Sequence, residues 1–115
     1  SMPRDYKVYL EDIIEAIAKI ERYVANLTFE EFSREEIVID ATIRNFEIIG
    51  EAVKRIPENI KQKYPEVEWK KIAGLRDILI HEYSAIDLEI LWDIIKNKLP
   101  DFKKNISKIL ENREK

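Results

Sequence analysis

The chain has 115 residues, of which 45% are hydrophobic and 37% are charged, and its formal net charge is −3 at pH 7. This length is typical of one domain with a cooperative core. The high charged share and the presence of only two glycines favour long amphipathic helices. The sequence contains no cysteine, which excludes disulfides and thiolate metal sites, and its single histidine excludes a multi-histidine metal cluster. The acidic balance excludes a strongly basic nucleic-acid binder, so any RNA contact needs a local patch.

The ends and the hydropathy of the chain predict a soluble, cytoplasmic protein. No apolar run approaches the roughly 20 residues of a membrane span, and no signal-peptide pattern opens the chain. Ser1 and Met2 resemble a remnant of tag cleavage. We therefore predict one helical domain over residues 3–115.

The first predicted helix runs from Asp5 to about Asn26, where the asparagine is a plausible stop. Its apolar residues recur three and four apart, which places them on one helical stripe. Thr28 then predicts a capped single turn over residues 28–32. The stripe consists of Tyr6, Tyr9, Leu10, Ile13, Ile17, Ile20 and Val24.

The second long helix is predicted to open with the capping box Ser33-Arg34-Glu35-Glu36, in which Ser33 caps the helix and Glu36 reaches back. It should end near Ile56, because Pro57 cannot continue a helix. Two non-polar sides are expected, and Gly50 suggests close packing by a neighbour. These sides are Val38, Thr42, Phe46, Ile49, Val53 and Ile56, and then Ile39, Ile43 and Gly50.

The remaining chain predicts a short helix or turn over residues 57–65 and a third long helix from Trp69 to residue 80. Residues 84–86 are expected to form a connector, with Asp87 as the next N-cap. We expect the helix that follows to break at Pro100. The last two apolar stripes are Leu88, Leu91, Trp92, Ile95 and Leu99, and then Phe102, Ile106, Ile109 and Leu110.

These elements predict an all-α fold, an up-and-down bundle of four to five helices. No strand-like alternation persists, and there is no internal repeat or linker. Ile90 and Ile94 add a second apolar side to their helix. Such two-sided helices are expected either to form a dimer interface or to be buried within the bundle. Both tryptophans fall on helical stripes, which favours the core over a base-stacking role.

The segment from Arg76 to Tyr83 carries the residue types that suit phosphate chemistry without a metal. A guanidinium can grip two phosphate oxygens, and an imidazole titrates near neutrality and can exchange protons. Asp77 lies one helical turn before His81 and could orient it. On an ideal helix Arg76 and His81 are about 140° apart, so they converge only where the helix ends or bends.

Each of these residues also has a structural interpretation. His81 could be a charge at a helix C-terminus, and Arg76 could pair with a glutamate. Asp77 could be a solvated charge, and Tyr83 a core residue. Spacing alone is therefore a weak signal. A basic stretch around the middle of the chain is expected to be either a solvated face or a track for a phosphate backbone. It comprises Lys54, Arg55, Lys61, Lys63, Lys70 and Lys71.

Several sequence motifs resemble those of the HepT-like toxins of the HEPN superfamily. Arg76-x-x-x-x-His81-x-Tyr83 resembles their R-x4-H-x-Y signature. The resemblance extends over roughly residues 5–110. It includes the run from Arg44 to Ala52, the approach to the signature from Tyr64-Pro65 through Trp69 to Asp77, and Asp87-Leu88-Glu89-Ile90-Leu91-Trp92.

This resemblance implies a metal-independent endoribonuclease that needs no cofactor, with Arg76 and His81 as the catalytic pair and Asp77 and Tyr83 in support. It implies a homodimer whose two signature segments meet across a cleft. It also implies a minimal nucleotidyltransferase antitoxin that adenylylates Tyr83, as in a type VII-like toxin–antitoxin pair. The alternative is a non-catalytic dimeric partner of a nucleotidyltransferase that binds nucleotide or RNA.

A second polar group lies on the second long helix. Arg44, Glu47 and Glu51 are three and four residues apart, so they could form a salt-bridge ladder. The resemblance adds the expectation that these three residues and Asn45 line the cleft.

Overall fold

The computed structural model describes residues 5–81 and 87–113, and for residues 76–81 it describes the backbone alone. Helices are the only regular secondary structure among the described residues. Its elements are α1 (Tyr6–Val24), α2 (Phe29–Arg34), α3 (Glu36–Arg55), α4 (Glu58–Lys63), α5 (Trp69–His81), α6 (Leu88–Asp93), the π-helix η2 (Ile94–Lys98) and α7 (Leu99–Arg113).

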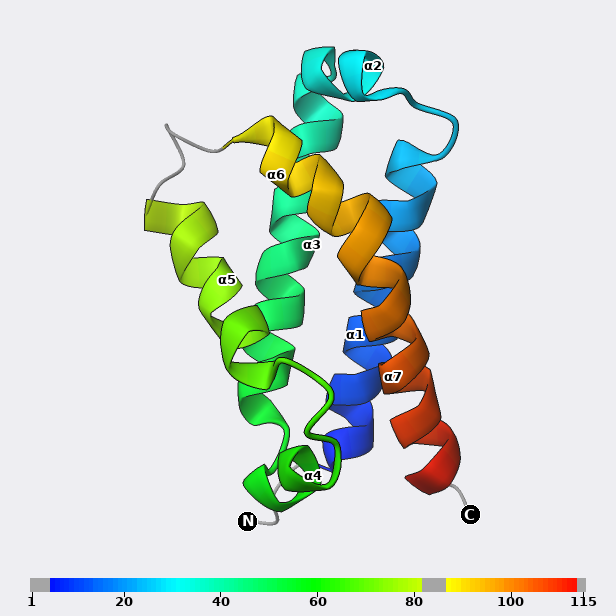
Figure 1. The fold of residues 1–115 in the computed structure, drawn as a ribbon, viewed down its shortest axis with the longest axis vertical. Helices are drawn as coiled ribbons and strands as arrows, with labels where there is room; N and C mark the ends of the chain where they lie inside the picture. Colours follow the sequence, from blue (N-terminus) through cyan, green and yellow to red (C-terminus); the bar gives the residue numbers. More distant parts are fainter. Residues whose placement is uncertain (1–4, 82–86, 114–115) are drawn as a thin grey trace.

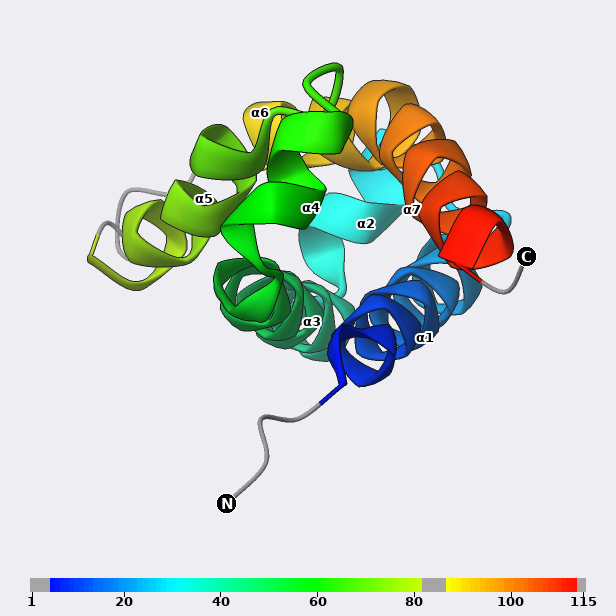
Figure 2. The same ribbon diagram turned by 90° about the horizontal axis from the view of Figure 1, so that it is seen from below.

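The helices form an up-and-down bundle, as the sequence predicted. Figure 1 shows α1, α3, α5 and the continuous α6–η2–α7 helix following the long axis in alternating directions. The two short helices lie at opposite ends, and Figure 2 shows α4 across the end that faces the viewer. The molecule measures 43 × 28 × 26 Å. No helix in the described part of the chain is long and apolar enough to span a membrane.

The predicted apolar stripes meet in one core. Helix α1 packs along α3, and α3 also packs against α5, while α7 lies against α1. The two predicted sides of α3 are both used, because Phe46 and Ile49 are buried together with Ile43 and Gly50. Both tryptophans belong to the core region. Trp69 is buried, and the ring of Trp92 packs 5.0 Å from that of Phe32.

The start of α1 and the end of α7 are joined at one end of the bundle. Asp5 caps α1 by accepting a hydrogen bond from the Lys7 backbone N–H, and it forms an ion pair with Arg113 of α7. The Arg113 guanidinium also lies 5.0 Å from the centre of the Tyr6 ring. The bond from the Lys7 N–H, supported by Arg113, holds the pKa of Asp5 below its ordinary value. These contacts join the first helix to the last.

The predicted capping box at Ser33 is wrong. Thr28 accepts from the Glu31 N–H, and the Glu31 carboxylate accepts from the Thr28 N–H, so the capping box belongs to α2. Helix α2 then extends to Arg34, and the Ser33 hydroxyl donates to the carbonyl of Glu30. Helix α3 begins directly after Glu35, which makes no side-chain capping bond.

The predicted break at Pro100 is also wrong, because the chain stays helical from Leu88 to Arg113. The turn before the proline widens into the π-helix η2, in which the Leu99 N–H donates to the carbonyl of Ile94. A wide turn reduces the clash between a proline ring and the preceding turn. The N-terminus of this long helix matches the prediction, since Asp87 accepts from the Glu89 and Ile90 N–H groups.

Candidate active site at the end of helix α5

The last two turns of α5 hold the backbone of the two predicted catalytic residues, Arg76 and His81, and of the predicted supporting residue Asp77. The helix runs without a break in its described part from Trp69 to His81, so Arg76, Asp77 and His81 all lie in it. The side chains of these three residues, and Tyr83 as a whole, lie outside the described residues. The spacing of Asp77 and His81 is one helical turn, as the sequence indicated.

Helix α3 positions this segment. The two helices pack side by side and run in opposite directions, so the end of α5 lies beside the first half of α3 (Figure 1). The anchor is apolar: Ile72 and Leu75, just before Arg76, are partly buried against the core. Hydrogen bonds fix the other end of α5, where the Trp69 indole donates to the carbonyls of Lys61 and Tyr64.

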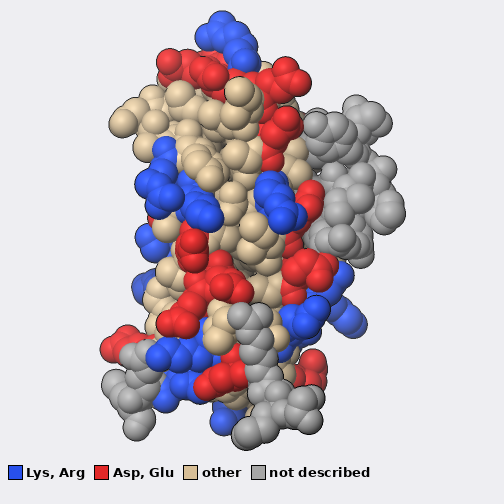
Figure 3. All heavy atoms as spheres, turned by 180° about the vertical axis from the view of Figure 1, so that it is seen from behind, with Lys and Arg blue, Asp and Glu red and all other residues tan. Residues whose placement is uncertain are grey.

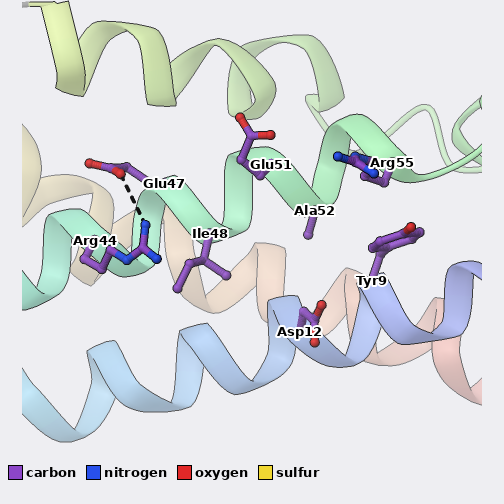
Figure 4. A pocket seen from close by; sticks show the side chains of 8 residues that line it. All are labelled: Tyr9, Asp12, Arg44, Glu47, Ile48, Glu51, Ala52 and Arg55. Carbon is purple, nitrogen blue, oxygen red and sulfur yellow. Dashed lines mark ion pairs between the residues drawn. The ribbon is translucent and has the colours of Figure 1, made fainter.

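A depression of about 370 Å³ lies on the outer face of α3 and is lined by residues of α3 and α1. Figure 4 shows Glu47 and Glu51 on the side of α3 that faces α5, whereas Ile48 and Ala52 face α1. The lining has three carboxylates and two guanidinium groups, so its charge is nearly balanced. Its residues are Tyr9, Asp12, Arg44, Glu47, Ile48, Glu51, Ala52 and Arg55.

The predicted polar group on α3 divides between this depression and the interior. Arg44 and Glu47 form an ion pair at 3.7 Å, with side chains 71% and 25% exposed, and Glu51 lies 3.9 Å from Lys54. Asn45 is instead buried, and its Nδ2 donates to the carbonyl of Ala41. The structure thus brings Arg44, Glu47 and Glu51 around one hollow and places Asn45 inside the bundle.

The face formed by α1 and α3 mixes uncharged surface with isolated charges. Figure 3 shows an uncharged band between acidic and basic groups on this side of the molecule. Ile37, at the start of α3, is 83% exposed. Sequence reasoning assigned Ile37 to neither side of its helix, although its spacing of seven from Arg44 places both on one face.

The predicted basic stretch lies at the end of α3, in α4 and at the start of α5. It is not a uniform basic surface, because acidic residues are interleaved with it. Lys71 donates a hydrogen bond of 3.1 Å to Glu68, and Lys54 pairs with Glu51.

Within the described residues, no group of three or more histidine, cysteine, aspartate or glutamate side chains could hold a metal ion.

Comparisons with known proteins identify the family. The family described as Ribonuclease HepT-like matches residues 13–109. A protein named "Probable ribonuclease HepT" from Thermococcus cleftensis is 43% identical over 94% of this chain and 98% of its own length. A "Putative RNase" from Methanocaldococcus jannaschii is 45% identical over 98% of this chain and 94% of its own length.

A second protein of Methanocaldococcus jannaschii, named "Gamma-glutamylcyclotransferase and putative RNase", is 41% identical over 99% of this chain, which spans 51% of that longer protein. No solved structure matches the chain. The family match covers most of the bundle and includes the R-x4-H-x-Y segment with the helix α3 that supports it. This chain belongs to the HepT-like ribonuclease family.

Proposed function

We propose that this protein is the toxin of a type VII-like toxin–antitoxin pair and acts as a metal-independent endoribonuclease. The observation that carries the proposal is the Arg76-x4-His81-x-Tyr83 signature, which lies inside the family match over residues 13–109 and whose Arg76 and His81 lie in the last two turns of α5. Its residue types are sufficient for phosphodiester cleavage without a bound metal. The substrate we propose is RNA, since its 2′-hydroxyl supplies an internal nucleophile.

In the proposed reaction the 2′-hydroxyl oxygen attacks the adjacent phosphorus and the bond to the 5′-oxygen breaks. His81 exchanges the protons of these two oxygens, a form of catalysis that contributes about 10²- to 10⁴-fold. Arg76 stabilises the negative charge that develops on the non-bridging phosphate oxygens. Asp77 orients the imidazole from one turn away, and Tyr83 assists in holding the substrate.

The proposal includes a homodimer whose two α5 ends meet across a cleft. The outer face of α3 supports this arrangement, because it carries the exposed Ile37 together with oppositely charged Arg44 and Glu47. A twofold interface brings the same patch of each subunit together, so it favours patches that are both apolar and of mixed charge. Such a face lies beside the end of α5 and would place two signatures close together.

We further propose that a minimal nucleotidyltransferase is the antitoxin. It would transfer AMP from ATP to the phenol oxygen of Tyr83, with release of pyrophosphate. The added phosphate carries negative charge next to Arg76 and His81, and would compete with the RNA phosphate for them.

The chemistry can be tested with a matched pair of substrates in excess EDTA. One is an RNA oligonucleotide that the protein cuts, and the other has a single 2′-deoxynucleotide at the cut position. We expect cleavage of the first to leave a 2′,3′-cyclic phosphate and the second to resist cleavage at that position. Equal cleavage of both substrates would contradict the proposed nucleophile.

A second measurement addresses the alternative function, a non-catalytic RNA- or nucleotide-binding partner of a nucleotidyltransferase. The protein is incubated with its nucleotidyltransferase partner and ATP, and the intact mass is measured for the parent and for Tyr83→Phe. Gain of one AMP by the parent alone, without RNA cleavage by the unmodified protein, would support that alternative. If Tyr83→Phe gained the same mass of AMP as the parent, Tyr83 would not be the residue that is adenylylated.

A further inference from the structure

A groove of about 730 Å³ lies on the opposite side of α3 from the depression described above, between α5 and α7. We name it the α5–α7 groove. Its floor contains the buried side chains Phe46 and Ile49 of α3 and Phe102 of α7. In Figure 1 the two bounding helices lie on either side of α3, and the segment between α4 and α5 crosses the lower end.

The walls of the α5–α7 groove are apolar where they approach the floor. Ile72 and Leu75 line it from α5, and Ile94 lines it from η2. Ile90 lies one helical turn before Ile94 and is 61% exposed, so the apolar wall continues past the end of the groove. A solvent-exposed apolar strip of this kind is typical of an interaction surface.

The rim is charged, and the charge is uneven. Lys98 of η2 and Lys104 and Lys108 of α7 follow one side, which carries one carboxylate, Asp101. The other two carboxylates of the lining, Glu66 and Glu68, lie in the segment between α4 and α5. None of these three lysines forms an ion pair with any residue that the structure describes. Lys71, on the α5 side, already binds Glu68. The α7 side therefore offers three positive charges that have no ion-pair partner among the described residues, beside an apolar floor.

The length of the groove distinguishes between kinds of ligand. Ile94 and Lys108 are 14 residues apart, so at about 1.5 Å per residue the α7 wall is about 20 Å long. A helix of about 14 residues has the same length. An apolar groove between two neighbouring helices commonly binds a third helix. The bound helix contacts the groove through apolar residues at positions i, i+3, i+4 and i+7.

We propose that the α5–α7 groove binds an amphipathic helix of another protein, with an apolar stripe on the groove floor and aspartate or glutamate beside Lys98, Lys104 and Lys108. The helix would complete the bundle between α5 and α7. Its apolar residues would cover Leu75, the residue that precedes Arg76. This binding site is independent of the ribonuclease proposal, because it requires no chemistry at Arg76 or His81.

The test uses a fluorescent peptide of about 16 residues, with leucine at i, i+4, i+7 and i+11 and with alanine and glutamate elsewhere. Fluorescence anisotropy should show saturable binding of this peptide to the full chain, whether the chain is a monomer or a dimer. The double variant Lys104→Glu/Lys108→Glu should weaken binding by about tenfold or more. The matched control Lys63→Glu/Lys70→Glu makes the same charge change outside the groove and should retain parental affinity.

Two further measurements locate the peptide. In methyl NMR spectra the peptide should shift Ile72, Leu75 and Ile94 while leaving the core residues Ile13 and Ile17 unchanged. The proposal fails if the peptide does not bind, if a scrambled peptide of the same composition binds equally, or if the two charge reversals have equal effects. It also fails if decanoate shifts the groove methyl groups and the peptide does not, since the groove would then accept small amphiphiles.

Discussion

Two buried polar side chains on α3 have hydrogen-bonding atoms without partners among the described residues. These atoms are Oγ1 of Thr42 and Oδ1 of Asn45. A buried hydroxyl without a partner costs about 1–3 kcal/mol. The sequence pattern placed Thr42 correctly on the core stripe, but spacing cannot reveal which polar groups find a partner.

We expect Thr42→Val to raise the free energy of unfolding by about 1 kcal/mol, because valine fills the same space without the hydroxyl. Thr42→Ser keeps the hydroxyl and loses a methyl group, and should lower it by about 1 kcal/mol. Urea unfolding followed by circular dichroism measures both. A destabilised valine variant would mean that the hydroxyl has a partner in solution.

At the scale of elements, the sequence predicted helices better than it predicted their ends. The periodicity of apolar residues predicted helix over each long helical segment of the described chain, since burial requires that spacing, but it divided the last segment at Pro100. Ser33 does not cap a helix, because the capping box of Thr28 and Glu31 begins α2 and Ser33 lies inside that helix. Pro100 does not end the helix. Ile95 and Leu99 before it and Phe102 after it are all buried, which favours one continuous helix with a π turn.

The cap of α2 predicts a pH dependence of stability. Hydrogen bonds from Thr28, chiefly from its backbone N–H, lower the pKa of Glu31 from its ordinary 4.5. A lowered pKa means that the ionised carboxylate favours the folded state above pH 4.5 and that this contribution is lost as the pH falls through the lowered value. Glu31→Gln should therefore be less stable than the parent at pH 7, and the difference should vanish in acid.

Unfolding midpoints in urea between pH 7 and strongly acidic pH test this prediction. Glu30→Gln is the matched control, because Glu30 lies in the same first turn of α2 and its carboxylate does not bind the Thr28 N–H. An equal pH dependence of the two variants would attribute the effect to the helix dipole rather than to the cap.

At the scale of the whole molecule, the bundle and its family could be predicted from sequence, whereas the surfaces could not. The stripe positions determine what is buried, and the signature motifs determine the family. The α5–α7 groove depends on how far apart two helices lie, which no local pattern encodes. Asn45 shows the same limit, because its motif grouped it with Arg44 and the fold separates them.

The proposed dimer predicts that Ile37→Glu shifts the protein from dimer to monomer, because it places a charge on the exposed apolar position of α3. Ile90→Glu is the control, since Ile90 is also exposed but lies on α6. Sedimentation velocity measures the oligomeric state. Dimers that survive Ile37→Glu would place the interface elsewhere.

The most direct test of the account is the rate of RNA cleavage in excess EDTA by the parent, His81→Ala and Arg76→Ala, with Lys108→Ala as the control. Loss of general acid–base catalysis should lower the rate of His81→Ala by about 10²-fold or more, and Arg76→Ala should be similarly impaired. Parent and control should cleave equally, and circular dichroism should show that all four proteins are folded. Cleavage that survives both substitutions would contradict an active site at the end of α5.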